Sequence, residues 1–172
     1  KTMFSGNTIN GSSIVNELKE ARVRFVIALP DIVTCDGLLW PISRDPDFQL
    51  ITICKEDEGV SICSGLSYSE NRAVVMMQHT GFLDSINSIR AMGMDYQLPI
   101  IMLVGLQGLE PDSSPNESSK NGVRIIIPML ELMQIDFHIL DKQSDVSSIS
   151  DLIDSAYKKS SPYVFLVTRA PL

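Results

Sequence analysis

Two short segments hold most of the side chains that could do chemistry. Three consecutive acidic residues begin at Glu56, directly after an apolar run. The segment 78–82 follows another apolar run and contains His79, Thr80 and Gly81. Carboxylates and imidazoles are the side chains that most often hold or transfer protons in enzymes. We therefore expect proton chemistry, with one of the three carboxylates as its first candidate.

Two further turns carry polar residues in the same kind of position. Pro30 and Asp31 follow the apolar run 23–29, and Gln107 follows the run 100–105. In open α/β sheets the ligand lies at the carboxyl ends of the strands. These turns are thus expected to lie at the same edge of a sheet as the acidic segment that begins at Glu56 and the segment 78–82.

The elements that must position these side chains follow from the apolar pattern. The runs are rich in Val, Ile and Phe and mostly continuous, which is typical of strands buried on both faces of a parallel sheet. Six strands are predicted, at 23–29, 48–53, 73–78, 100–105, 136–140 and 163–167. Helices are predicted between them, at 14–21, 34–40, 56–67, 82–92, 124–134 and 146–158. The pattern predicts an open, mostly parallel six-stranded sheet with helices on both faces, as one domain over residues 1–172.

Two local features need separate mention. Ser12 or Ser13 is expected to cap the first helix, since serine hydroxyls accept hydrogen bonds from free amides at helix starts. The segment 108–122 is rich in Ser, Pro and Asn. A loop of this length in a compact domain is usually a lid, a partner contact or a disordered stretch.

Composition and missing motifs exclude several classes of protein. The net charge of −7 argues against nucleic-acid binding, which needs a basic face. No apolar run is long enough for a membrane span, and the first residues lack the apolar core of a signal peptide. The three cysteines form no CxxC pair, so a reducing, cytoplasmic compartment is expected. The phosphate-binding and dinucleotide-binding glycine motifs are absent, and His79 and His138 lack metal-ligand spacing to a cysteine.

The two segments together resemble a known family. KEDEGVSICSG (55–65) followed by QHTGFLDSIN (78–87) is similar to the pyrimidine-binding domain of thiamine-diphosphate-dependent decarboxylases, closest to the sulfopyruvate and phosphonopyruvate decarboxylase branch. Glu56 stands nine residues before Gly65, and Gly81 and Asn87 keep the spacing of the second run. The turn 29–31 is similar to the family's Val-Pro-Asp turn.

The resemblance implies roles for individual residues. Glu56 would be the catalytic residue that hydrogen-bonds N1′ of the aminopyrimidine and promotes its imino tautomer. Glu58 is the second candidate for this role and Asp57 the third; alternatively, the acidic residues only favour a helix N-terminus. The implied cofactor-binding residues are Pro30, Glu56, Thr80, Gly81 and Phe82. The implied substrate contacts are Asp31, His79 and Gln107, and no metal ligand is expected in this chain.

The resemblance also implies a partner. Family members hold Mg²⁺ and the diphosphate with a Gly-Asp-Gly … Asn stretch in a second domain, and no Gly-Asp dipeptide occurs in this sequence. A beta subunit is therefore expected to supply that domain, in an α2β2 or larger heteromer. The expected function is that of the alpha subunit of a split 2-oxoacid decarboxylase.

Two departures from the family leave the substrate open. Gln107 stands where relatives that accept phosphonate or sulfonate substrates commonly carry an arginine, and Ile32 replaces a small polar residue. An amide lacks the charge and the bidentate fork of a guanidinium. A less charged 2-oxoacid, an acyloin-forming carboligase activity, and a non-catalytic assembly subunit of the same fold all remain open. Outside the family, a small flavodoxin-like binding domain is the alternative.

Overall fold

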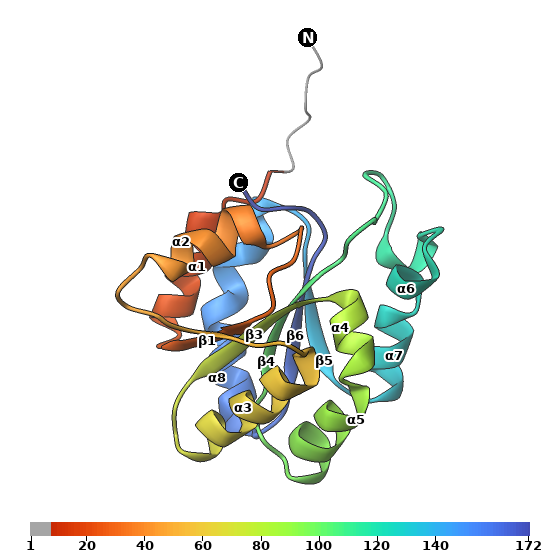
Figure 1. Cartoon of the computed structure of the whole chain (residues 1–172). Coiled ribbons are helices and arrows are strands. Elements are labelled where there is room, and N and C mark those ends of the chain that lie inside the picture. Colours follow the sequence, from red (N-terminus) through yellow and green to blue (C-terminus); the bar gives the residue numbers. More distant parts are fainter. Residues whose placement is uncertain (1–7) are drawn as a thin grey trace.

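The computed structural model describes residues 8–172 and contains one six-stranded sheet in which every neighbouring pair is parallel (Figure 1). The strands are β1 (Phe25–Ala28), β2 (Gln49–Thr52), β3 (Ala73–Gln78), β4 (Ile101–Gly105), β5 (Asp136–Leu140) and β6 (Tyr163–Val167). Their order across the sheet is β2-β1-β3-β4-β6-β5. The predicted fold class is confirmed. The first seven residues, for which no signal peptide was predicted, lie outside the described residues.

Helices cover both faces of the sheet because successive strand residues point to opposite sides. Val26 packs into one apolar cluster and its neighbour Ile27 into the other. The first cluster is covered by α1 (Gly11–Glu20), η1 (Cys35–Leu39), α2 (Trp40–Ser43), η4 (Gln143–Ser148) and α8 (Ile149–Lys159). The second is covered by α3 (Glu56–Tyr68), α4 (His79–Asp84), α5 (Ile86–Ser88), η2 (Ile89–Asp95), α6 (Asn121–Arg124) and α7 (Ile126–Leu132).

Several predicted helices differ from the observed ones. The predicted helices 34–40, 124–134 and 146–158 each span parts of two observed helices, and two further differences lie at the first helix and at 82–92. The first helix begins at Gly11, and Asn10 rather than Ser12 or Ser13 caps it, because the Asn10 side chain accepts a hydrogen bond from the Ser12 amide at 2.9 Å. The predicted helix 82–92 begins earlier, at His79, and is broken at Ser85 into α4, α5 and the π-helical η2. Both differences are local. Neither changes which face of the sheet the segment covers.

Five helices end in the same unusual way. The residue at or just after each C-terminus has a left-handed backbone although it is not glycine, as its positive φ of 51° to 63° shows. Such a residue lets the last helical carbonyls find amide partners, but glycine adopts this conformation with less strain. The five residues are Arg22, Glu70, Gln97, Gln134 and Ser160.

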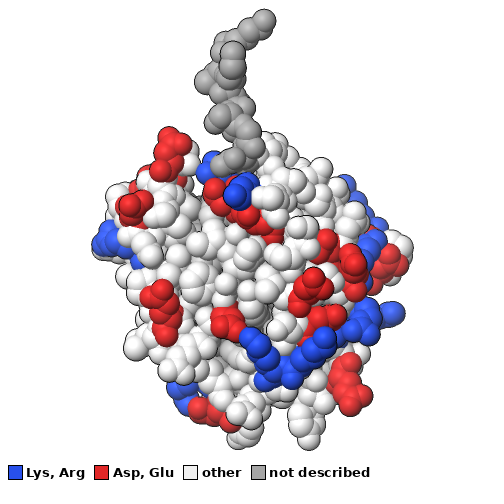
Figure 2. Space-filling view, turned by 180° about the vertical axis from the view of Figure 1, so that it is seen from behind, with Lys and Arg blue, Asp and Glu red and all other residues white. Residues whose placement is uncertain are grey.

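Surface charges lie close to charges of the opposite sign. Lys19 pairs with Asp45 at 2.7 Å and with Asp47 at 2.8 Å. The face seen in Figure 2 carries acidic and basic side chains next to one another, with wide uncharged areas between them. Within residues 8–172, no helix has both the length and the apolar character needed to cross a membrane.

Candidate functional site

The candidate site lies where the path of the chain changes direction across the sheet. From β1 the chain passes to β2 on one side, and β3 then joins β1 on the other. The connections after β1 and β3 diverge at the carboxyl edge, and such a switch point is where ligands bind in open α/β sheets. A cavity of about 400 Å³ lies there, lined by Pro30, Asp31, Ile32, Cys35, Asp36 and Gln78. The turn after β1 thus meets the end of β3 at this cavity, while Glu56, Gly81 and Gln107 are not among its lining residues.

Glu56 is the first residue of α3 and is half-buried. Its side chain lies against the backbone of Gly81, the third residue of α4, so closely that a Cβ on Gly81 would overlap Glu56 Cγ and Oε1. Within residues 8–172, no hydrogen bond or ion pair engages the Glu56 carboxylate. A half-buried carboxylate with no protein partner is available to a ligand.

The other two acidic residues are occupied by the start of α3. Glu58 Oε2 accepts from the amides of Cys54 and Lys55, both at 3.3 Å, and so satisfies two amides at the start of α3. Asp57 Oδ1 accepts from the Glu58 amide at 3.0 Å. Capping the helix therefore explains Glu58 and Asp57. It does not explain Glu56.

The segment 78–82 forms the start of α4, beside Glu56. Thr80 is exposed, with its hydroxyl 3.5 Å from Gln78 Oε1, whereas the Phe82 side chain is fully buried in the core beneath. An ion pair of 3.2 Å between Lys55 and Asp84 links the start of α3 to the end of α4. The ring of Phe82 thus supports the turn from inside, and its direct contact with a cofactor stays a prediction.

Asp31 serves the backbone of its own turn. Its Oδ1 accepts from the amides of Val33 at 2.7 Å and Thr34 at 3.0 Å, and its Oδ2 accepts from the Thr34 hydroxyl. The side chain is buried and holds the turn in one conformation. Its proposed contact with substrate remains a prediction. Pro30, by contrast, is exposed at the mouth of the cavity.

His79 lies in the wall of the site. It is 7% exposed, and its Nε2 is 3.0 Å from the position that a Cβ on Gly122 would take. Its buried Nδ1 has no hydrogen-bond partner among the described residues. Burial lowers the pKa of His79, and the backbone of Gly105 opposes this shift. The imidazole is thus favoured in its neutral form, and a substrate contact by His79 stays a prediction.

Gln107 stands in a tight turn after β4. The Leu109 amide donates to the Leu106 carbonyl at 3.2 Å, and Gly108 has the positive φ of 84° that the third position of such a turn requires. Gln107 is half-buried. Arg124 donates to the Ser118 carbonyl at 2.9 Å and to Asn121, so its guanidinium is engaged in the neighbouring loop.

Arg169 was missed by the sequence reasoning. It follows β6, at the same carboxyl edge as the other candidates, and bonds to the carbonyl of Pro111 in the loop after β4. The strand-end rule that selected Glu56 and Gln107 applies equally to Thr168 and Arg169, so this signal was present in the sequence.

Comparison with known proteins finds relatives that share one name and have low sequence identity to this chain. The chain is 27% identical over 96 residues to the sulfopyruvate decarboxylase subunit alpha of Methanocaldococcus jannaschii, which is 56% of each protein. It is 23% identical over 151 residues to the protein of the same name from Methanothermobacter thermautotrophicus, covering 87% of this chain and 90% of the relative. No family model matches the sequence. The match thus spans just over half of the first relative and most of the second.

A solved structure shares the fold. A domain of the Magnetococcus marinus 2-oxoglutarate:ferredoxin oxidoreductase, determined with 2-oxoglutarate, coenzyme A and succinyl-CoA bound, superposes with a TM-score of 0.65 at 11% identity. The superposition covers 95% of this chain and 29% of that one. At this identity the likeness concerns the fold alone. The chain therefore combines a shared α/β fold with sequence similarity to sulfopyruvate decarboxylase alpha subunits.

Proposed function

We propose that this chain is the pyrimidine-binding subunit of a split thiamine-diphosphate-dependent 2-oxoacid decarboxylase. The observation that carries the proposal is the Glu56 carboxylate, which lies against Gly81 at the carboxyl edge of the sheet and has no hydrogen-bond or ion-pair partner among the described residues. The named relatives support the decarboxylase class and the alpha-subunit role.

The residues present fit an aminopyrimidine ring. A carboxyl group can share a proton with a ring nitrogen, and Glu56 is the one member of the acidic trio that accepts no hydrogen bond within residues 8–172. The bare Cα of Gly81 leaves room for the carboxylate, since a side chain there would displace it. Glu56, Thr80, Gly81 and Pro30 would hold the ring, and the buried Phe82 would support them.

The chemistry divides between the coenzyme and the chain. Thiamine diphosphate, when bound, supplies the electron sink for loss of carbon dioxide from a 2-oxoacid. Glu56 would hydrogen-bond the ring nitrogen through a carboxyl oxygen and exchange a proton with it. Asp31 fixes the turn that borders the cavity, because three local hydrogen bonds restrain its carboxylate.

A beta subunit would complete the site. The name "subunit alpha" of the relatives supports a partner chain, which we expect to hold Mg²⁺ and the diphosphate in an α2β2 or larger heteromer. The name also makes sulfopyruvate the first 2-oxoacid to test. The uncharged Gln107 favours a less charged tail, so pyruvate is the substrate to compare with it.

The test is proton exchange at the reactive carbon of the coenzyme, in the complex reconstituted with the partner subunit. We expect Glu56→Gln to slow this exchange by about 10²–10⁴-fold, the usual size of an acid–base contribution. Glu58→Gln is the matched control. It should weaken the start of α3 and leave exchange close to the native rate. Unchanged exchange in Glu56→Gln would contradict the proposal.

A further inference from the structure

The loop between β4 and α6 has an ordered internal structure. Glu110 accepts hydrogen bonds from the Ser118 hydroxyl at 2.8 Å, from the Ser119 amide at 3.1 Å and from the Ser119 hydroxyl. These bonds lower the pKa of Glu110 to about 2, so its carboxylate is charged at any physiological pH. A short helix, η3 (Pro115–Glu117), lies inside the segment that Glu110 closes. The two arms of the loop are thus tied to each other.

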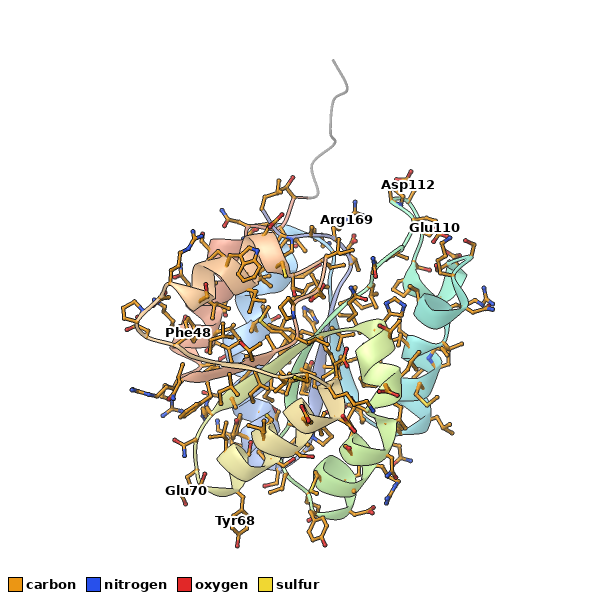
Figure 3. All side chains as sticks on the ribbon, in the orientation of Figure 1. Phe48, Tyr68, Glu70, Glu110, Asp112 and Arg169 are labelled. Carbon is orange, nitrogen blue, oxygen red and sulfur yellow. The ribbon has the colours of Figure 1, made fainter. Side chains whose placement is uncertain are left out.

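One side chain ties this loop to the sheet. Arg169 Nη2 donates to the Pro111 carbonyl at 3.0 Å. The same guanidinium donates to Asp141 Oδ1 from Nε at 3.3 Å and from Nη2 at 3.2 Å, and Thr168 donates to that oxygen at 2.8 Å. Figure 3 shows Arg169 at the same edge of the molecule as Glu110 and Asp112. The guanidinium of Arg169, which follows β6, therefore links the residue after β5 to the loop.

Parts of the loop pack on the protein, since Leu109 lies against the second apolar cluster and Pro115 is buried, but residues 111–115 face an open space. A cavity of about 450 Å³ separates residues 111–115 from the ends of β5 and β6, and Ile139, Asp141, Thr168 and Arg169 line its other side. This cavity lies where the order of the strands reverses a second time. The chain passes from β4 to β5 at the edge of the sheet, and β6 then inserts between them. Few apolar contacts can hold a loop across an open space. Arg169 bridges it.

Both ends of the loop lie against the candidate site. At its start, a Cβ on Gly105 would be 3.2 Å from Asp31 Oδ1, and Gln107 follows two residues later. At its end, Gly122 packs on the His79 ring. A shift of the loop would thus move Gln107 and loosen the contact at His79.

We propose that Arg169 is a positioning residue that fixes this loop as one wall of the site and so sets the place of Gln107 for the substrate. The effect on substrate rests on the proposed function; the effect on the loop does not. A guanidinium is needed because its planar fork reaches a carboxylate and a carbonyl at once, which an ammonium group cannot match.

The first experiment measures amide hydrogen exchange in residues 108–120 of the full chain. We expect Arg169→Ala to speed exchange there about 10-fold, from the loss of a charge-assisted hydrogen bond, and Arg169→Lys to restore part of the protection. Arg90→Ala is the matched control, because Arg90 pairs with Asp95 in η2 rather than with the loop. Unchanged exchange in Arg169→Ala would overturn the proposal.

The second experiment measures steady-state kinetics of the reconstituted complex on the preferred 2-oxoacid. Arg169→Ala should raise KM about 10-fold and leave kcat within about twofold, because the wall binds substrate and does not take part in the chemical step. Arg169→Lys should fall between Ala and the native residue. A loosened loop with unchanged KM would overturn the role in substrate binding. A native complex inactive on every 2-oxoacid would overturn the proposed function, and hydrogen exchange would still decide what Arg169 does to the loop.

Discussion

At the scale of single residues, Glu56 and Gly81 depend on each other. A methyl group on Gly81 would occupy the volume of the Glu56 side chain. We expect Gly81→Ala to displace the carboxylate and to lower kcat of the complex by about 10²-fold, the usual cost of misplacing a reacting group by about 1 Å. Kinetics of the purified complex would measure this.

Gly65→Ala is the control for that experiment. Gly65 lies inside α3, and apart from its chain neighbours and the backbone of its own helix no described residue lies within 4 Å of a Cβ at this position. Alanine there should stabilise the helix by up to about 1 kcal/mol without moving Glu56. If the Gly81→Ala complex has the native kcat, activity does not depend on the present position of the Glu56 carboxylate.

His79 leads to a prediction about pH. Burial lowers its pKa in the folded chain, whereas the unfolded chain takes up the proton near its ordinary value of 6.5. The unfolded state then binds more protons as the pH falls below about 6.5, so His79 makes the free energy of unfolding decrease from that pH downwards. Above about pH 6.5 the histidine is neutral in both states and contributes no slope.

Urea unfolding of the native chain and of His79→Asn, at about pH 8 and about pH 5.5, measures this contribution. From about pH 8 to about pH 5.5, the free energy of unfolding should decrease more in the native chain than in His79→Asn. A difference that does not depend on pH would show that the buried ring is protonated as easily as in the unfolded chain.

The sequence could predict which residues lie at the edge of the sheet that carries the candidate site. It could not predict the direction in which each side chain points. Glu56 and Gly81 were identified by the family resemblance of the segments 55–65 and 78–87, and the structure brings them together. Asp31 lies at the predicted edge, yet its carboxylate turns back to the amides two and three residues ahead. Aspartate often makes this local bond in turns, so the sequence contained a hint of a structural role.

At the scale of elements, the first helix gives a direct test of a corrected prediction. Asn10 accepts the capping bond at the start of α1. Asn10→Ala should lower the free energy of unfolding by about 1 kcal/mol, and Ser13→Ala should change it by far less. Thermal or urea unfolding of the two variants decides between Asn10 and the serines. A larger loss in Ser13→Ala would restore the serine as the cap.

The strands were easier to predict than the helix boundaries. Continuous apolar runs of Val, Ile and Phe mark strands that are buried on both faces, and all six runs contain a strand. Helix ends depend on single side chains, such as Asn10, and on breaks such as the one at Ser85. These depend on tertiary packing, and hydrophobic spacing does not report them.

At the scale of the whole molecule, strand order decides what the site contains. The order β2-β1-β3-β4 places the ends of the first four strands side by side at the carboxyl edge. The apolar pattern predicts a parallel sheet but not this order. The same order places β6 beside β4, and this is why Arg169 reaches the loop after β4 although 58 residues separate it from Pro111.

The five residues with a left-handed backbone at helix C-termini are positions where substitution can raise the melting temperature of the protein. Glycine relieves the crowding of Cβ against the backbone at such positions, and each replacement should add up to about 1 kcal/mol. For a chain of this size, each added kcal/mol raises the melting temperature by about 2–4 °C. Glycine at Gln97 and Gln134 alone should give a measurable rise in calorimetry. Because helices here end at the amino edge of the sheet, opposite the candidate site, activity should survive the gain in heat resistance.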